Sequence, residues 1–525
     1  MCRWGWRSVR AKPGAARISA EKLPVADDDI AQLARGGRTS FFGFLLRLAA
    51  RLPFLFIAGR WYGADALGRF AYAVIVVEFA AQLATFGLKR GLAQQLSTSE
   101  RDPVCDIWDA LLVGFAGAAV AAVVLIAFPI AMFPNSPING MDRLLPLTVF
   151  GWVGSDIALA ALAYRGNVGA TVKARALWEP WVISIGAFGL SWYSLRDGLI
   201  VAYVLSMAAA LVASLVPLLK EYGPPRGWRP QYRRAAELAR SNWPLAGADA
   251  CEWGSRRLDI AILGLFFSPA LVGIYYVAQQ VASLPQKLKT TFDPILGPVI
   301  TQKLAEDDQA AVARQVRQVG FWIIAAQVGV ALALAIPGEA VMGLVGPGFV
   351  GGTAALAILL AAEAVAATAV VSEAALIYVA PKRNLVISLA MIAVQAALSV
   401  VLIYALRGLT EYTFVATPTL RDDKIAAVGP ALGLILALAF AAVAKAWLLH
   451  RQLRAPVIGW RWALLPAMAL GGIVGWAFTK LPRHYEWVEL AFGIPAILGS
   501  YGYLVWRRGF GKEDRALFRT KAGEA

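Results

Sequence analysis

The chain contains few of the side chains that build metal sites, disulfide frameworks and acid–base catalysts. Its 525 residues include two histidines, His450 and His484, and three cysteines, Cys2, Cys105 and Cys251. The cysteines stand alone, without a C-x-x-C pair or a neighbouring histidine, so their spacing predicts neither a zinc site nor a disulfide framework. The motifs G-x-S-x-G and G-x-x-x-x-G-K-[ST] are also absent. We therefore predict no enzyme, no metal and no cofactor, and an energy source other than ATP hydrolysis.

Charged residues are scarce as well, and apolar residues are abundant. The chain is 16% charged and 59% hydrophobic, whereas soluble domains have about 25% and about 45–50%. The apolar residues gather in runs of about 20, the length that crosses a hydrocarbon core of ~30 Å. The first 40 residues are polar and basic and lack the apolar segment of a signal peptide. We expect an all-α polytopic membrane protein.

The positive charge follows the pattern of membrane topology. Fourteen apolar runs are present, and with both termini inside, the inner segments carry about four times as many Lys and Arg residues as the outer loops. This predicts a multi-pass protein of the bacterial cytoplasmic (inner) membrane with cytoplasmic N- and C-termini. The net charge of +16 comes without a nucleic-acid recognition motif, so no nucleic-acid partner is expected. Lys89-Arg90, at a predicted cytoplasmic end, are either topology determinants or guides for an anionic headgroup.

A short internal repeat indicates two similar halves. The segment Ala66 to Ala73 reads A-L-G-R-F-A-Y-A, and Leu271 to Ala278 reads L-V-G-I-Y-Y-V-A, so that Gly68 aligns with Gly273 at an offset of 205. Six spans separate the copies, and an even number is typical of a parallel repeat about an axis along the membrane normal. The predicted parts are a cytoplasmic tail at 1–40, an N-lobe of six spans at 41–219, a cytoplasmic linker at 220–242, a C-lobe of six spans at 243–449, two further spans at 450–506, and a cytoplasmic tail at 507–525.

Two longer segments carry a family resemblance. Arg60 to Leu96 contains R-W-Y-G-A-D-A-L-G-R-F-A-Y-A and then F-G-L-K-R-G-L-A-Q-Q-L; Arg257 to Ala305 contains R-L-D-I-A-I-L-G-L-F-F-S-P-A-L-V-G-I-Y-Y-V-A-Q-Q and then P-I-L-G-P-V-I. Both resemble bacterial polysaccharide flippases for O-antigen or exopolysaccharide, within the multidrug/oligosaccharidyl-lipid/polysaccharide exporter superfamily. The resemblance extends over most of the chain through the fourteen-span layout, but not over the first 40 residues or 407–424.

The resemblance implies a V-shaped pair of six-helix bundles around a central cavity. It also implies a substrate, an oligosaccharide on undecaprenyl diphosphate, which is moved from the inner to the outer leaflet by alternating access during polysaccharide biosynthesis. Membrane lipid and a polysaccharide polymerase are the further partners expected. The superfamily's lipid II flippase and its proton- or sodium-coupled multidrug exporters share the fold, so these functions remain alternatives. A non-transporting scaffold in a polysaccharide synthesis complex is another.

Arginines within the predicted spans are the candidate substrate-binding residues. A charge at the bilayer centre costs about 2.5–3.5 kcal/mol, and arginine binds phosphate through a planar fork that stays charged. Arg47 and Arg51 lie at i, i+4 in the span near 41–59, and Arg256 and Arg257 lie in the span near 244–266. We predict that these four hold the diphosphate. The alternative for Arg47 is that its side chain reaches the headgroups.

The span near 244–266 also carries carboxylates. On one continuous helix, Asp249, Glu252, Arg256 and Asp259 fall within an arc of ~80°, while Arg257 points elsewhere. Such a stripe cannot face lipid. It predicts either a network that faces the cavity and exchanges protons, or structural pairing of Glu252 with Arg256 and of Arg256 with Asp259.

Four further acids lie within predicted spans. They are candidate coupling-ion sites, because intramembrane acids commonly serve that role, or else paired residues that pack the lobes. Lys445, near a cytoplasmic span end, is expected to extend toward the headgroups. The four acids are Glu78, Asp156, Glu363 and Glu373.

Overall fold

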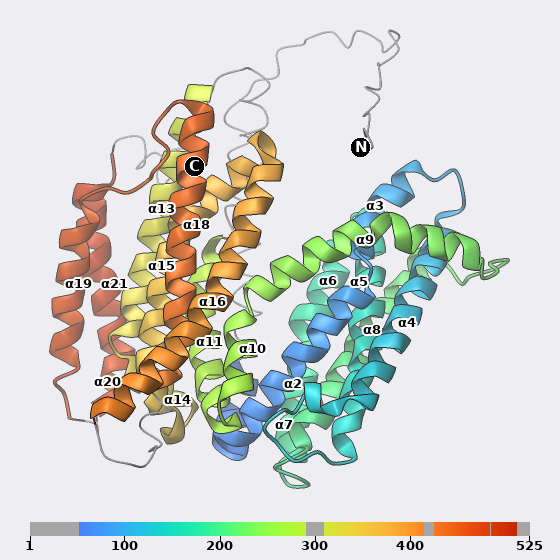
Figure 1. Ribbon diagram of the computed structural model, residues 1–525, viewed down its shortest axis with the longest axis horizontal. Helices are drawn as coiled ribbons and strands as arrows, with labels where there is room; N and C mark the ends of the chain where they lie inside the picture. Colours follow the sequence, from blue (N-terminus) through green and yellow to red (C-terminus); the bar gives the residue numbers. More distant parts are fainter. Residues whose placement is uncertain (1–51, 290–308, 414–424, 483–484, 512–525) are drawn as a thin grey trace, which may run out of the picture.

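The computed structural model describes residues 52–289, 309–413, 425–482 and 485–511, and all secondary structure in these ranges is helical. Figure 1 shows two helical bundles that meet at the lower end of the view and diverge toward the upper end. The prediction of an all-α polytopic membrane fold is confirmed.

The N-terminal bundle consists of the elements up to residue 222. Its long helices pack around α2, which contacts both α4 and α5. Its elements are η1 (Ala58–Tyr62), α2 (Gly63–Ala84), α3 (Leu88–Thr98), α4 (Pro103–Ala127), η2 (Pro129–Ala131), η3 (Met141–Leu147), α5 (Thr148–Tyr164), α6 (Val168–Val172), η4 (Lys173–Trp178), α7 (Glu179–Leu190) and α8 (Gly198–Tyr222).

The C-terminal bundle is built around α15 and α18, which pack against each other, and a last helical pair, α19 and α21, packs on α13. Its elements are α10 (Leu258–Phe266), α11 (Pro269–Lys289), α13 (Gln309–Ala335), α14 (Gly338–Val345), η5 (Pro347–Gly352), α15 (Thr353–Val379), α16 (Pro381–Thr413), α18 (Gly429–Leu453), α19 (Leu464–Phe478), α20 (Glu486–Val488), η7 (Glu489–Gly493), α21 (Ile494–Leu504) and η8 (Val505–Gly509).

Within the described ranges, nine helical segments are long and apolar enough to cross a membrane, and Leu464–Phe478 is a shorter apolar helix. One of the nine, Leu52–Thr98, folds back on itself. Its chain reverses at Gly63, whose φ of +79° lies in the region that favours glycine. The reversal brings the Phe54 and Phe70 rings to 5.8 Å. The segment therefore contains parts of two predicted spans, and the total of fourteen stays a prediction.

The two bundles meet where α2 crosses α11. Gly68 and Gly273 face each other there, and a Cβ on Gly68 would collide with the backbone nitrogen of Gly273. Small residues allow this close approach of two helices. At the same end, the Asn135 side-chain amide donates to the carbonyls of Gly264 (2.8 Å) and Phe267 (3.1 Å) across the two bundles. The bundles are thus closed at this end, which is the predicted outer side.

The internal repeat is visible in the helix boundaries. Shifted by the offset of 205, the range 63–84 becomes 268–289, and α11 runs over Pro269–Lys289. The two glycines that align in the sequence are the two that touch in space. This is the geometry of a parallel pseudo-repeat whose axis passes between the bundles.

Helix α9 (Tyr232–Ser255) connects the bundles and differs from its predicted form. It packs on α2, α3 and α4 of the N-terminal bundle, and Figure 1 shows it lying obliquely across that bundle. Because α9 begins at Tyr232, the predicted linker at 220–242 is largely helical, and only 223–231 lies between helices. The predicted span near 244–266 is not one continuous helix, because α9 ends at Ser255 and α10 starts at Leu258.

Candidate functional site

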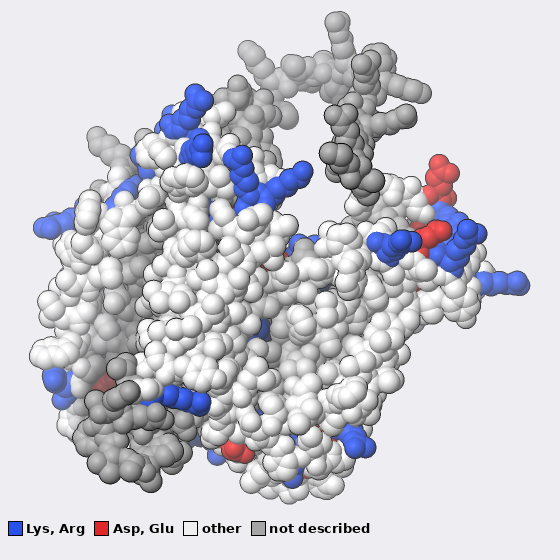
Figure 2. Space-filling view, viewed as in Figure 1, with Lys and Arg blue, Asp and Glu red and all other residues white. Residues whose placement is uncertain are grey.

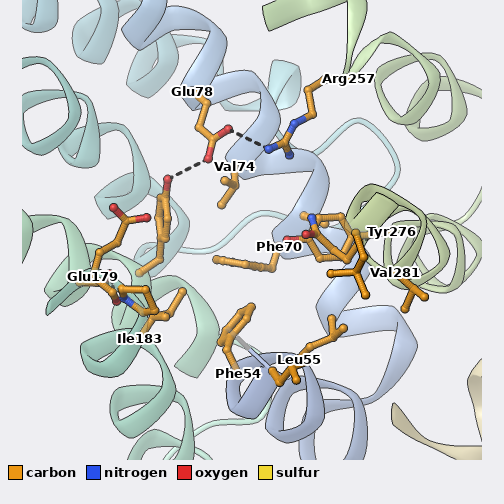
Figure 3. A pocket seen from close by; sticks show the side chains of 17 residues that line it. Phe54, Leu55, Phe70, Val74, Glu78, Glu179, Ile183, Arg257, Tyr276 and Val281 are labelled. Atoms are coloured by element: carbon orange, nitrogen blue, oxygen red, sulfur yellow. Dashed lines mark hydrogen bonds and ion pairs between the residues drawn. The ribbon is translucent and has the colours of Figure 1, made fainter. Parts of the chain in front are cut away.

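A cavity lies between the bundles, beyond the crossing of α2 and α11 (Figure 3). Its volume is about 140 Å³, room for about ten water molecules at roughly 10–15 Å³ each or for a phosphate-sized group. Most of its lining is apolar. Its charged and aromatic members are Phe54, Phe70, Glu78, Glu179, Tyr203, Arg257 and Tyr276.

An ion pair across the cavity joins the two bundles. The Arg257 guanidinium, between α9 and α10, lies 3.9 Å from the Glu78 carboxylate on α2. The other Glu78 oxygen accepts a hydrogen bond from the Tyr203 hydroxyl at 3.4 Å, and that hydroxyl accepts from the Trp152 indole at 2.7 Å. Figure 3 shows Glu78 between its two partners. A carboxylate and an arginine thus face each other from separate lobes.

Behind this pair, Arg175 organises a buried polar group in the N-terminal bundle. The residue lies in η4, a π-helical turn, and its guanidinium bonds to Asp156 and Ser155 on α5 and to Glu179 at 2.9 Å. Its charge also lies 4.3 Å from the centre of the Trp152 ring. The sequence analysis identified Asp156 as an intramembrane acid but did not identify Arg175 or Glu179 as its neighbours. The spacing of Arg175 and Glu179 at i, i+4 was the available signal.

The buried charges around Arg175 yield a stability prediction. We expect Arg175→Met to lower the free energy of unfolding by about 3–5 kcal/mol, because it removes the buried cation that pairs with Glu179 and leaves Asp156 with only the half-exposed Lys89. Thermal unfolding of the detergent-solubilised protein measures the loss. The control is Arg196→Met, at a half-exposed arginine 4.0 Å from Asp197, where about 0–1 kcal/mol is expected. Adding Asp156→Asn should recover part of the loss, whereas strictly additive effects would contradict the pairing.

Toward the end of the molecule at which the bundles diverge, α9 is tied to α3 (Figure 1). Arg90 pairs with Asp249 at 2.9 Å and with Glu252 at 2.6 Å. Gly91 allows the close contact, since a Cβ there would collide with the Asn242 side chain. Lys89 lies 3.7 Å from Asp156. The Lys89-Arg90 pair therefore belongs to the same charge network as the predicted acids.

The break between α9 and α10 separates the predicted span-7 charges. Arg256 caps α9 and pairs with Glu252 at 3.4 Å, as one alternative predicted, whereas Arg257 turns into the cavity. Asp259 is fully buried in the other bundle, where it accepts from Tyr275 at 2.9 Å and Gln279 at 3.0 Å. The single stripe of four charges, and the pairing of Arg256 with Asp259 that it allowed, are therefore wrong.

The structure also places the remaining predicted residues. Arg47 and Arg51 lie outside the described residues. Glu363 and Glu373 lie on α15, away from the cavity lining, and Glu373 is 3.3 Å from Lys445 on α18. Lys445 is buried, so the prediction that it extends to the headgroups is wrong. A nearby carboxylate satisfies its charge inside the bundle.

Exposure sets the sign of the charge that a guest would meet. Among the ion-paired side chains around the cavity, the cationic Lys89, Arg90 and Arg256 are 52%, 53% and 51% exposed. The carboxylates of Glu78, Asp156 and Asp249 are 11%, 8% and 8% exposed, and Glu252 alone among the acids is half-exposed. Opposite charges are therefore present together, but the accessible side of the network is mainly cationic.

The open side of the molecule leads to this site. Figure 2 shows the surface hollowed between the two bundles at the upper edge of the view, with Lys and Arg side chains on the upper parts of both. Figure 1 places α3 and α9 on the N-terminal bundle at this upper end. Among the described residues no cluster of His, Cys, Asp and Glu has the arrangement of a metal site.

Two helical bundles, closed at one end and open at the other around a charged cavity, define a class of multi-pass helical membrane protein. The lipid II flippase MurJ in an inward closed conformation has a similar fold, with 10% sequence identity and a TM-score of 0.65 over 92% of this chain and 99% of that one. An inward-facing multidrug resistance MATE transporter of the MOP superfamily is similar, with 14% identity and a TM-score of 0.58 over 78% of this chain and 94% of that one. An outward-facing transporter of the same description has 12% identity and a TM-score of 0.53 over 81% of this chain and 97% of that one. No curated protein matches the chain in sequence.

A family model described as "Polysaccharide biosynthesis protein" matches residues 59–345, more than half of the chain. The chain belongs to this family. The resemblance to polysaccharide flippases, found in Arg60 to Leu96 and Arg257 to Ala305, is thereby confirmed at the level of the family.

Proposed function

We propose that the protein is a flippase that moves an undecaprenyl-diphosphate-linked oligosaccharide from the inner to the outer leaflet of the cytoplasmic membrane, for lipopolysaccharide or exopolysaccharide synthesis. The observation that carries this proposal is the position of Arg257. Its guanidinium lies in a cavity between the two bundles, and the cations of the ion pairs between α3, α5 and α9, Lys89, Arg90 and Arg256, are half-exposed. Cations on an access path raise the local concentration of an anionic guest.

A diphosphate matches this site in chemistry and size. Arginine binds phosphate oxygens through two parallel N–H donors, and the cavity of about 140 Å³ holds a phosphate group but not an oligosaccharide. The sugars would therefore occupy the wider space between the bundles, and the lipid chain would remain in the bilayer. The described cavity contains a single arginine beside two acids, so Arg47 and Arg51 are proposed to add positive charge.

The difference between the two ends of the molecule supports alternating access. The crossing of α2 and α11 closes the predicted outer side, and the opposite side is open. Rocking of the bundles would exchange the two openings. With a negative cytoplasm, outward movement of each negative charge through 100 mV is favourable by about 2.3 kcal/mol, so the potential can drive a diphosphate outward.

We propose the intramembrane acids as the elements that reset the empty carrier, and a polysaccharide polymerase as a partner that receives the product. These acids are Glu78, Asp156, Asp249, Glu252, Asp259, Glu363 and Glu373.

The proposed domain organisation keeps the lobes and their topology. The N-lobe comprises 41–219, and α9 connects it to a C-lobe that begins at α10 and, as predicted, ends at residue 449. Two further spans at 450–506 and cytoplasmic tails at 1–40 and 507–525 complete the proposal.

Depletion of the protein tests the function. We expect the lipid-linked oligosaccharide to accumulate with its sugars on the cytoplasmic side, because the step that turns the headgroup over is then missing. Lectin binding to intact spheroplasts, compared with binding to opened vesicles, measures the two leaflets separately. Restoring the wild-type gene should restore outer-leaflet labelling.

The same experiment separates the alternatives. Lipid II is a second candidate, since its diphosphate has the same chemistry and the lipid II flippase MurJ has the same fold. Accumulation of lipid II, or sensitivity to cationic drugs with a normal oligosaccharide distribution, would contradict the proposed substrate.

A further inference from the structure

The cation of the cavity already has an anionic partner. Arg257 lies 3.9 Å from Glu78, and Figure 3 shows the two side chains pointing toward each other. Carboxylate and phosphate oxygens accept hydrogen bonds from the same guanidinium donors. A phosphate that binds Arg257 must therefore displace Glu78, or share the arginine with a like charge.

The N-terminal bundle has a place for the displaced carboxylate. The Tyr203 hydroxyl accepts from Trp152 at 2.7 Å, so its own proton is directed to Glu78 at 3.4 Å. This second distance is long for a hydrogen bond between oxygens, which have a usual separation of about 2.7–2.8 Å. Glu78 can thus move away from Arg257 and gain a shorter bond to Tyr203, which is itself buried.

We propose that Glu78 is a built-in competitor for the phosphate site: it occupies Arg257 in the empty carrier and is exchanged for the guest, while Tyr203 retains the displaced carboxylate. This rests on the proposed function, that the guest is a lipid diphosphate. A tethered carboxylate has a high effective concentration at its partner. Monoanionic phospholipids, which fill the surrounding leaflet, offer Arg257 one charge only and lose this competition, whereas a diphosphate carries enough charge to win it.

The exchange of Glu78 for the guest also couples guest binding to the contact between the two bundles. Glu78 belongs to α2 and Arg257 to the start of α10, so exchange replaces a contact between lobes by a contact with the guest. A guest shifts a conformational equilibrium only through its different affinity for the two states. Breaking an inter-lobe ion pair supplies such a difference, and Glu78 is therefore a specificity-determining residue.

Binding to the full-length protein in nanodiscs tests the exchange. The probes are geranylgeranyl diphosphate, geranylgeranyl monophosphate and phosphatidylglycerol, titrated by calorimetry or by displacement of a fluorescent diphosphate. We expect Glu78→Gln to bind the diphosphate about tenfold more tightly and to gain more for the two single-phosphate probes, so that selectivity falls. Glu237→Gln, at an exposed position of α9, is the control and should change nothing.

The variant Tyr203→Phe provides a second test of the exchange in the same binding experiment. It should weaken diphosphate binding in the wild-type background and have no effect beside Glu78→Gln, because the displaced carboxylate is then absent. If Glu78→Gln does not fold, Glu78→Asp, with a shorter reach to Arg257, should show a smaller gain.

The possible failures are distinguishable. Unchanged or weaker binding in the Glu78 variants, together with loss of binding in Arg257→Gln, would overturn the exchange and leave the proposed function intact. Equal binding of all probes to the wild type and to Arg257→Gln would overturn the proposed function itself.

Discussion

Replacement of Arg257 by alanine is expected to reduce export of the lipid-linked oligosaccharide by about thirtyfold or more. In the proposed function the Arg257 guanidinium donates hydrogen bonds to the diphosphate; each hydrogen bond to a charged group contributes about 1.5–3 kcal/mol, and each 1.4 kcal/mol is about a factor of ten. The variant loses the only arginine among the described cavity-lining residues and also leaves the Glu78 carboxylate without its cation. The rate at which oligosaccharide reaches the outer leaflet, per molecule of inserted protein, measures the effect.

The neighbouring arginine is a matched control. Arg256 has the same chemistry one position earlier, yet it caps α9 and pairs with Glu252 while half-exposed. Exposed ion pairs contribute about 0–1 kcal/mol, so Arg256→Ala should reduce export by about fivefold at most. Arg257→Lys should be intermediate, since lysine keeps the charge but not the planar fork. Equal losses in Arg256→Ala and Arg257→Ala would contradict the separate roles that the helix break creates.

Gly68→Leu is expected to prevent closure of the predicted outer side and to abolish most export. A Cβ at Gly68 would collide with backbone atoms of Pro269 and Gly273, and backbone of a packed helix cannot move aside as a flexible side chain does. Overpacking costs about 1–3 kcal/mol in ordinary cores, and here the cost falls only on the state in which α2 and α11 touch. The ratio of closed to open molecules should therefore fall by about five- to 150-fold.

Thiol labelling reports this shift directly. Ser136, which lies beside Gly68 at the crossing, can be replaced by cysteine after removal of the native cysteines. A membrane-impermeant reagent added from outside should label Ser136→Cys faster in the Gly68→Leu background. Gly499→Leu is the control, because a Cβ at Gly499 meets nothing within 4 Å. Unchanged labelling, with export at the wild-type rate, would show that the crossing does not close the outer side.

Some of the site was visible in the linear sequence because membrane burial of charge is costly. Glu78, Asp156, Asp249 and Glu252 were identified as intramembrane acids, and they do lie in one charge network around the cavity. Arg175 and Tyr203 were not identified. Arg175 lies at a predicted span edge, where an arginine needs no explanation. Tyr203 looks in the sequence like an ordinary residue of an apolar span, and its role depends on tertiary contacts with Trp152 and Glu78.

The sequence by itself determined the class of architecture. Long apolar runs in a chain with 16% charged residues can satisfy their backbone hydrogen bonds in lipid as helices, and the offset of 205 predicted two similar bundles with Gly68 and Gly273 in equivalent places. Both inferences depend on local pattern and length alone.

Only the tertiary structure decided which charges meet. A continuous helix would place Arg256 with Asp259 and turn Arg257 away, but the chain breaks between Ser255 and Leu258. Gln279 on α11 stabilises that break by donating to the Arg256 carbonyl at 3.2 Å and to the Asp259 carboxylate. Helical periodicity describes a single element, whereas a carbonyl freed at a helix end takes its partner from elsewhere in the fold. The side on which Arg257 points is therefore a property of the packed bundles.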